Sequence, residues 1–218
     1  MPTPSIDDYL QAIYKLESGE DGPPVSTGAL ADAMQVTPAS ASNMVRRLDD
    51  LGFITYEAYA GATLTDPGRT VALEVIRHHR LLELYFKEVM GFDWETVHHE
   101  AERLEHHISE TFEERIEEML GHPTRDPHGH PIPTRDGIMA DLSTLTLADA
   151  SEDTSVTIDH VSDEDPDVLD LLEQRGLLPG ATVNIIETRP IEGLMVIAIE
   201  GEETIIGRPV AEKVFIKA

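Results

Sequence analysis

Six residues between positions 79 and 106 have the types and spacings of metal ligands. His79 and Glu83 are four residues apart, so they would share one face of a helix with about 3.6 residues per turn. The other four would share an arc of roughly 100° on the next helix: His98, Glu102, Glu105 and His106. Imidazole and carboxylate without sulfur suit Mn(II), Fe(II) or Zn(II). The sequence therefore predicts a metal-binding region on two neighbouring helices.

The composition limits the classes of protein that the chain can belong to. It has 218 residues, a formal net charge of −26 from 42 acidic and 16 basic residues, and no cysteine. The lack of cysteine excludes disulfides and thiolate metal sites. No apolar run approaches the ~18 residues of a membrane span, and the N-terminus lacks the basic and apolar regions of a signal peptide. We therefore expect a cytoplasmic protein without membrane contact.

The acidic charge has the wrong sign for a nucleic-acid-binding protein in dilute salt. At molar ionic strength the screening length is about 3 Å, so surface carboxylates would hardly repel DNA. Excess Asp and Glu with scarce Lys is what a salt-adapted cytosol favours, and only four of the 16 basic residues are lysine. We interpret the composition as that of a protein from a salt-adapted organism. The alternative is a chain that does not bind DNA.

The first 72 residues have the order of elements of a winged helix-turn-helix. Apolar residues of helical period predict a helix that ends near Ser18, and Ser26 can cap a short second helix. Thr37-Pro38 begins a third helix, because threonine caps helices and proline suits the first helical position. The runs 53–56 and 62–64 predict a hairpin, which would be the wing.

Helices are also predicted in the middle of the chain. They cover about 66–90, 94–107 and 109–120, and they carry the six metal-ligand candidates. The proline- and glycine-rich stretch 122–137 packs little by itself, and residues 141–154 are polar and acidic, as in a linker. Short β runs with one helix between them fill residues 155–218 and indicate a small SH3-like β-barrel. The fold class is therefore mainly α with a small β domain.

The third helix carries the candidate DNA contacts. A helix-turn-helix places the N-terminal half of its second helix in the major groove. Small polar groups for base edges, a methyl for thymine and two arginines for phosphates occur there: Thr37, Ala39, Ser40, Ser42, Asn43, Arg46 and Arg47. Each alone could be an ordinary capping or surface residue. The whole pattern of elements favours DNA binding.

Several strings, in order along nearly the whole chain, resemble the diphtheria-toxin-repressor family of metal-dependent transcriptional regulators. They are PSIDDYLQAIY at 4–14, LTDPGR at 64–69, HRLLE at 79–83, HHEAE at 98–102 with EH at 105–106, and GHP at 121–123 with PIP at 131–133. The resemblance implies a homodimer that binds a palindromic double-stranded operator when divalent metal fills two sites per subunit, and so represses metal-uptake genes. It also implies a domain order: a winged helix-turn-helix at 1–72, a helical metal-binding and dimerisation domain at 73–140, a linker at 141–154 and an SH3-like (FeoA-like) barrel at 155–218.

The resemblance also divides the ligand candidates into two sites. One site combines His79, Glu83 and His98 with Asp165 of the barrel. The other joins Asp8 of the first helix to Glu102, Glu105 and His106. Val168 stands where the family has a glutamine ligand, although three acids lie nearby as substitutes: Asp163, Glu164 and Asp167. Family members tuned for iron often carry Met and Cys where this chain has Asp8 and Glu102, which favours Mn(II) over Fe(II).

Four further histidines have no such role by resemblance. His99 and His107 are interpreted as surface residues. His128 and His130 lie in the proline-rich stretch and raise the alternative of a third metal site, which the sequence disfavours.

Two other functions compete with DNA binding. A metal-dependent hydrolase would use the same carboxylates around an open coordination position. The chain has no His-Glu-x-x-His string, no nucleophile elbow and no glycine loop that would hold a nucleotide cofactor. A metal buffer would need no helix-turn-helix. The sequence therefore predicts a regulator rather than an enzyme, with Mn(II) or Fe(II) as its metal.

Overall fold

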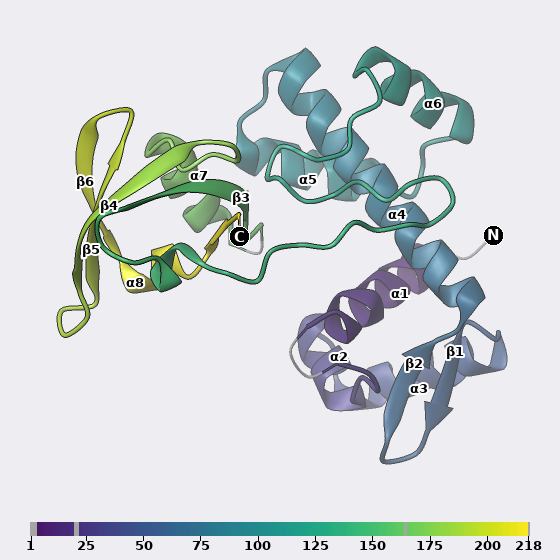
Figure 1. The fold of residues 1–218 in the computed structure, drawn as a ribbon. Helices are drawn as coiled ribbons and strands as arrows, with labels where there is room; N and C mark the ends of the chain where they lie inside the picture. The colour runs from purple at the N-terminus through teal and green to yellow at the C-terminus, as the bar shows by residue number, and fades with distance from the viewer. Residues whose placement is uncertain (1–3, 20–21, 164, 218) are drawn as a thin grey trace. The chain divides into compact units, whose positions relative to one another are not determined.

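A computed structural model describes residues 4–19, 22–163 and 165–217. The chain divides into two compact units. The first contains the residues up to 79 together with 105–108 and 133–138, and the second contains 80–104, 109–132 and the residues from 139 onward. The predicted fold class is confirmed, since helices dominate the first two thirds of the chain and a small antiparallel sheet lies in the last third (Figure 1).

The N-terminal part is a winged helix-turn-helix (Figure 1). Its elements are α1 (Pro4–Glu17), α2 (Thr27–Ala33), α3 (Pro38–Asp50), β1 (Ile54–Glu57) and β2 (Gly61–Leu64). The predicted caps form, because the Ser26 side chain accepts a hydrogen bond from Ala29 N and the Thr37 side chain accepts one from Ser40 N. Leu10, Leu30 and Leu48 are fully buried in the core that joins these elements. This core fixes α3 relative to α1.

The long helix α4 (Asp66–Tyr85) continues in a π-helical turn (Phe86–Met90). Gly91 ends the turn with a φ of 73°, in the left-handed region that glycine adopts without strain. The predicted helix from residue 66 to 90 is therefore present, with its last five residues wound more widely.

The next helix is shorter than the sequence predicts. α5 (Trp94–Leu104) ends at Leu104 rather than near residue 107, and α6 (Glu110–Met119) follows. Ser109 caps α6 from an extended conformation, with φ −94° and ψ 155°, so the chain must leave the helical conformation before it. Glu105 and His106 therefore lie in the turn after α5. The prediction that they share one helical arc with His98 is wrong.

The C-terminal sheet contains five antiparallel strands in the order β6-β5-β4-β3-β7. The strands are β3 (Thr154–Val161), β4 (Thr182–Arg189), β5 (Leu194–Ile199), β6 (Glu202–Gly207) and β7 (Val214–Ile216), with helices α7 (Pro166–Gln174) and α8 (Arg208–Ala211) between them. The sequence does not predict β6 or α8. In β6 only Ile206 is buried, so the strand lacks the apolar alternation that reveals a half-buried strand.

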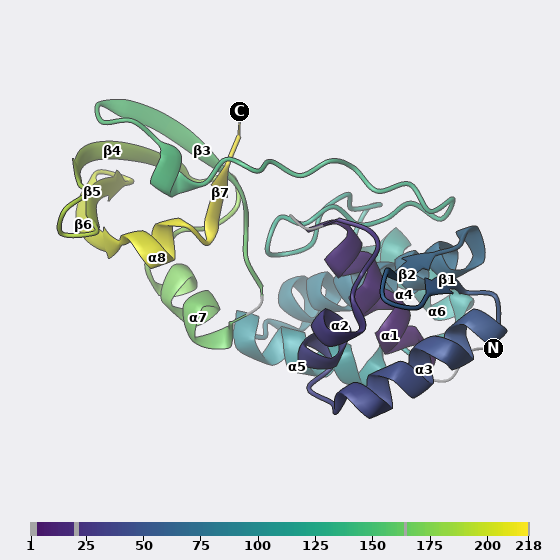
Figure 2. The ribbon, with the colours of Figure 1, turned by 90° about the horizontal axis from the view of Figure 1, so that it is seen from below.

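Part of the acidic segment before the sheet packs against it. Residues 139–145 run without regular structure toward the sheet (Figure 2), and a 3₁₀ turn (Leu147–Asp149) follows. Leu147 is fully buried in the core of the sheet, and Thr146 forms a β-bridge with Phe215. The second half of the predicted linker thus belongs to the C-terminal core. No described helix is long and apolar enough to cross a membrane.

We expect Leu147→Ala to lower the free energy of unfolding by about 2–5 kcal/mol, because it leaves a cavity in this core. Denaturant unfolding followed by circular dichroism measures the loss. Leu145→Ala is the matched control, since Leu145 lies on the same segment but is 45% exposed. Equal effects of the two variants would contradict the packing role of Leu147.

Candidate metal centres and DNA-binding helix

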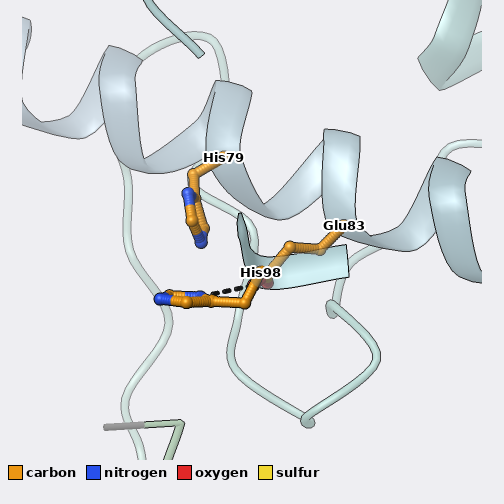
Figure 3. Close-up of side chains that lie close together, drawn as sticks. All are labelled: His79, Glu83 and His98. Carbon is orange, nitrogen blue, oxygen red and sulfur yellow. Dashed lines mark hydrogen bonds and ion pairs between the residues drawn. The ribbon is translucent and has the colours of Figure 1, made fainter. Parts of the chain in front are cut away.

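His79, Glu83 and His98 form the first group of candidate ligands (Figure 3). His79 and Glu83 project from the same face of α4, one turn apart, and His98 comes from α5. One ligand atom from each lies within 4.8 Å of the others, and His98 Nδ1 is 3.1 Å from Glu83 Oε1. Glu83 is fully buried and His79 is nearly so. A group of two imidazoles and one carboxylate, with only His98 partly exposed, fits a divalent first-row metal.

Asp8, Glu105 and His106 form the second group. His106 Nε2 lies 2.7 Å from Asp8 Oδ1 and 3.3 Å from Glu105 Oε1. Asp8 comes from α1, whereas the other two come from the turn after α5. Because α5 ends at Leu104, the side chains of Glu105 and His106 can both point toward α1. Oxygen-rich donors with one imidazole suit Mn(II) and Fe(II).

Sequence reasoning did not find Asp7 beside this group. Asp7 Oδ2 is 3.5 Å from His106 Nδ1, on the other edge of the ring from Asp8. Burial raises the pKa of Asp7 and the charge of Asp8 raises it further, although His106 acts in the opposite direction. Two adjacent acids in the first turn of a helix are so common that the sequence carries no signal to single out Asp7.

Glu105 contacts a histidine of each group. Its Oε1 faces His106, and its Oε2 is 2.5 Å from His79 Nδ1. The His78 ring also donates a hydrogen bond from Nδ1 to the Glu105 carbonyl, at 3.0 Å, and so holds the turn in place. Histidines that bind metal usually donate their second ring N–H to a carboxylate, which fixes the ring. Glu105 provides that support for His79.

Two predicted ligands lie outside these groups. Glu102, predicted to join Asp8, instead has its carboxylate 3.4 Å from His98 Nε2 and is 56% exposed. It follows the face of α5 that carries His98, because the two are one turn apart. Asp165 caps α7 by accepting hydrogen bonds from the backbone N–H groups of Asp167 and Val168.

The family resemblance places a second barrel ligand at Val168 or at one of the acids near it. Val168 packs against the core of the sheet. Asp163 Oδ2 lies 3.8 Å from His130 Nδ1. Glu164 lies outside the described residues. None of the described acids of this segment is in the group with His79.

The structure also brings together Asp126, His128 and His130, which the sequence disfavours as a site. All three are buried, so the stretch predicted to pack little is packed here. Burial lowers the pKa of His128, but the hydrogen bond and charge of Glu83 raise it above the ordinary value. For His130 burial again lowers the pKa, and the charges of Asp126 and Asp163 raise it above the ordinary value. The surroundings of both rings thus favour positive charge.

The predicted DNA contacts occupy the outer face of α3. Ala41, Val45 and Leu48 form its buried side. The exposed candidates are Thr37, Ala39, Ser40, Asn43, Arg46 and Arg47, and Ser42 is half-buried. Thr37 is engaged as the N-cap, and its Oγ1 is 3.0 Å from Ser40 Oγ. Asn43, Arg46 and Arg47 are spaced so that they share one exposed face.

Three domains of known protein families match consecutive parts of the chain. The N-terminal DNA-binding domain of the iron-dependent repressors matches residues 1–62, and their metal-binding and dimerisation domain matches residues 65–134. The FeoA domain matches residues 145–218. An uncharacterized HTH-type transcriptional regulator of Methanocaldococcus jannaschii is 37% identical over 101 residues, which are 46% of this chain and 80% of that protein. The chain belongs to the diphtheria-toxin-repressor family.

Further relatives are regulators of the same family. The transcriptional regulator MntR of Lysinibacillus sphaericus is 36% identical over 105 residues, 48% of this chain and 73% of that protein. A solved manganese-dependent transcriptional repressor in complex with manganese is 34% identical with a TM-score of 0.89, and the match covers 97% of this chain and 99% of that one. ScaR with bound Zn²⁺ is 30% identical with a TM-score of 0.79, over 99% of both chains. These relatives are named as regulators or repressors, not as enzymes.

Proposed function

We propose that the chain is a homodimeric repressor that binds a palindromic operator when Mn(II) or Fe(II) fills two sites per subunit. The metal-uptake genes of a salt-adapted cytoplasm would be its targets. The two sites would be His79, Glu83 and His98, and Asp8, Glu105 and His106. The domain division is part of this proposal: residues 1–72 bind DNA, 73–140 bind metal and dimerise, and 155–218 form the barrel. Of the predicted linker 141–154, only the first half links, since the second half packs with the barrel.

The contact between His106 and Asp8 carries the proposal. Asp8 lies on α1 of the DNA-binding domain, and its Oδ1 is 2.7 Å from His106 Nε2. A metal held by both residues ties α1 to the turn that follows α5. Without metal, Asp7, Asp8 and Glu105 bring negative charge together around one imidazole, which favours looser arrangements. Metal then shifts the population toward the arrangement that it binds more tightly, and that arrangement binds DNA.

Manganese is the favoured metal in this proposal. The second group offers two carboxylates and one imidazole and no sulfur. Hard oxygen donors favour Mn(II), and the chain has no cysteine for softer ions. The solved relative that binds manganese supports the same choice.

Gel-shift titration of operator DNA in molar KCl tests the proposal, with the metal-free protein and with added Mn(II), Fe(II) or Zn(II). Mn(II) is expected to raise operator affinity, and a chelator is expected to reverse the increase. Metal-independent binding, or no binding at any salt concentration, would contradict the proposal. Hydrolysis of a test ester or phosphate without DNA binding would favour a metalloenzyme instead.

Arg46→Ala is expected to weaken binding to all DNA sequences alike and to reduce the slope of log affinity against log salt by about 1, because one phosphate contact is lost. Titrations at several KCl concentrations measure the slope. Arg189→Ala is the matched control, since Arg189 lies on β4 and pairs with Glu187. A slope unchanged by Arg46→Ala would remove α3 from the proposed DNA contact.

A further inference from the structure

One carboxylate of the barrel reaches the helices that carry the first candidate site. Glu173 lies on α7, and α7 packs against α5 (Figure 2). Its Oε1 is 2.5 Å from Lys87 Nζ, in the π-helical turn that follows α4. Its Oε2 accepts a hydrogen bond from the backbone N–H of Trp94, the first residue of α5, at 3.3 Å. Glu173 therefore contacts the end of one helix and the start of the next.

Each of these contacts lies about one helical turn from a candidate ligand. Lys87 follows Glu83 by four residues, and Trp94 precedes His98 by four residues. Glu83 Oε1 and His98 Nδ1 are 3.1 Å apart (Figure 3). Because these two ligand atoms come from different helices, their separation depends on how α4 and α5 are held relative to each other. Glu173 acts on both helices close to the point where that separation is set.

The Trp94 side chain anchors the start of α5 in the barrel. It is 2% exposed and belongs to the same buried core as Leu169 and Leu172 of α7. Its ring also packs edge-on against the His128 imidazole, with 5.0 Å between the ring centroids. A buried tryptophan contributes a large apolar area, so displacing it is costly. The first turn of α5 is thus fixed by the core of the sheet as well as by the carboxylate on α7.

The position of Glu173 suits a role in metal binding that needs no ligand from the barrel. Asp165, the predicted barrel ligand, caps α7. The Glu173 and Lys87 side chains are only 29% and 27% exposed, so salt screens their ion pair less than one on the open surface. We propose that Glu173 is a positioning residue for the first candidate site, through which the barrel sets metal affinity by keeping Glu83 and His98 together. This inference rests on the proposed function, which assigns a metal to that site.

Mn(II) titration of the full-length protein tests this inference, with the electron paramagnetic resonance signal of free Mn(II) as the readout. His106→Gln removes a ligand of the second site, so that the first is measured alone, and His98→Gln does the reverse. Glu173→Ala is expected to weaken Mn(II) binding on the order of 10-fold in the His106→Gln background, the size of effect that residues supporting metal ligands have. In the His98→Gln background it should change nothing.

Asp170→Ala is the matched control, because Asp170 is an exposed acid on the same helix and accepts a hydrogen bond from Gln174. It should keep the Mn(II) affinity in both backgrounds. Glu173→Gln should restore part of the affinity, since its amide oxygen can still accept from the Trp94 N–H although the ion pair is lost. Trp94 is the only tryptophan of the chain, so its fluorescence shows whether the core stays packed in each variant. If Glu173→Ala loosens the core, Lys87→Met decides, because it removes the ion pair and leaves α7 unchanged.

Two results would overturn the inference. One is an unchanged Mn(II) affinity of Glu173→Ala in the His106→Gln background. The other is an equal loss in both backgrounds, because a general loosening of the fold acts on both sites. If the wild type bound no Mn(II), the proposed function itself would fall, and this inference with it. Wild-type binding that Glu173→Ala does not alter would contradict the positioning role alone.

Discussion

Glu105→Gln is expected to reduce the operator affinity of the Mn(II)-loaded protein to that of the metal-free protein. The loss should be on the order of 100-fold, near the upper end of the coupling that an effector commonly exerts between sites. The reason is that one carboxylate serves both proposed sites, with Oε1 toward His106 and Oε2 toward His79. An amide keeps the shape of the side chain but is a much weaker ligand. Gel-shift titration with and without Mn(II) measures the effect.

Glu100→Gln is the matched control, because Glu100 lies on α5 and pairs with Arg103 rather than with a candidate ligand. It should leave metal activation unchanged. Asp8→Ala should resemble Glu105→Gln, whereas Glu102→Ala should have the smaller effect, since Glu102 is exposed and faces His98. If Glu105→Gln kept full metal activation, the second site would be misassigned. A melting temperature lowered without metal would indicate that Glu105 stabilises the fold instead.

Phe112→Glu is expected to make the protein monomeric and to lower its operator affinity by at least on the order of 100-fold, because linked binding of two half-sites is lost. Phe112 and Met119 are 47% and 54% exposed on α6, and their spacing of seven residues puts them on one face. They lie in the part of the chain that matches the dimerisation domain of the family. A buried carboxylate at an apolar interface carries a large desolvation cost. Light scattering after gel filtration gives the mass.

Ile191→Glu is the control for added charge on an exposed apolar residue. Ile191 is fully exposed in the turn between β4 and β5, and its replacement should leave the protein dimeric. If Phe112→Glu stayed dimeric and kept wild-type operator affinity, the dimer interface would lie on another face of the protein. Phe112→Leu should restore the dimer, since it restores apolar surface without the original ring.

The starts of the helices could be predicted because their causes are local. Ser26, Thr37 and Ser109 each accept a hydrogen bond from a backbone N–H in the first turn, and each is visible in the sequence as a cap. Ser109 requires only that α5 end before it, so the exact end of α5 at Leu104 has no local mark. It depends on where Glu105 and His106 find partners, and those partners lie far away in the sequence, on α4 and α1. β6 could not be predicted from the sequence either, because most of its side chains are exposed.

The residues of the candidate sites also separate into those that local spacing can group and those that depend on distant partners. Helical spacing is enough to place His79 and Glu83 on one face of α4. Spacing puts Glu102 with the ligands that join Asp8, whereas in the structure the Glu102 carboxylate lies 3.4 Å from His98 Nε2. It also cannot reveal His128, whose burial depends on how the loop around Asp126 packs near Glu83. Residue type and spacing therefore group candidate ligands that share one helix, but not candidates that tertiary packing brings together.

The two-sided contact of Glu105 has a consequence for the metal response of the protein. When an ion at His106 and Asp8 fixes Glu105, the same carboxylate is held against His79 and orients that ring for the other ion. By thermodynamic reciprocity, the second ion must favour the first by the same factor. We therefore expect the two ions to bind with positive cooperativity. Occupancy then rises more steeply with free metal than at two independent sites, so a smaller change in supply is enough to switch operator binding.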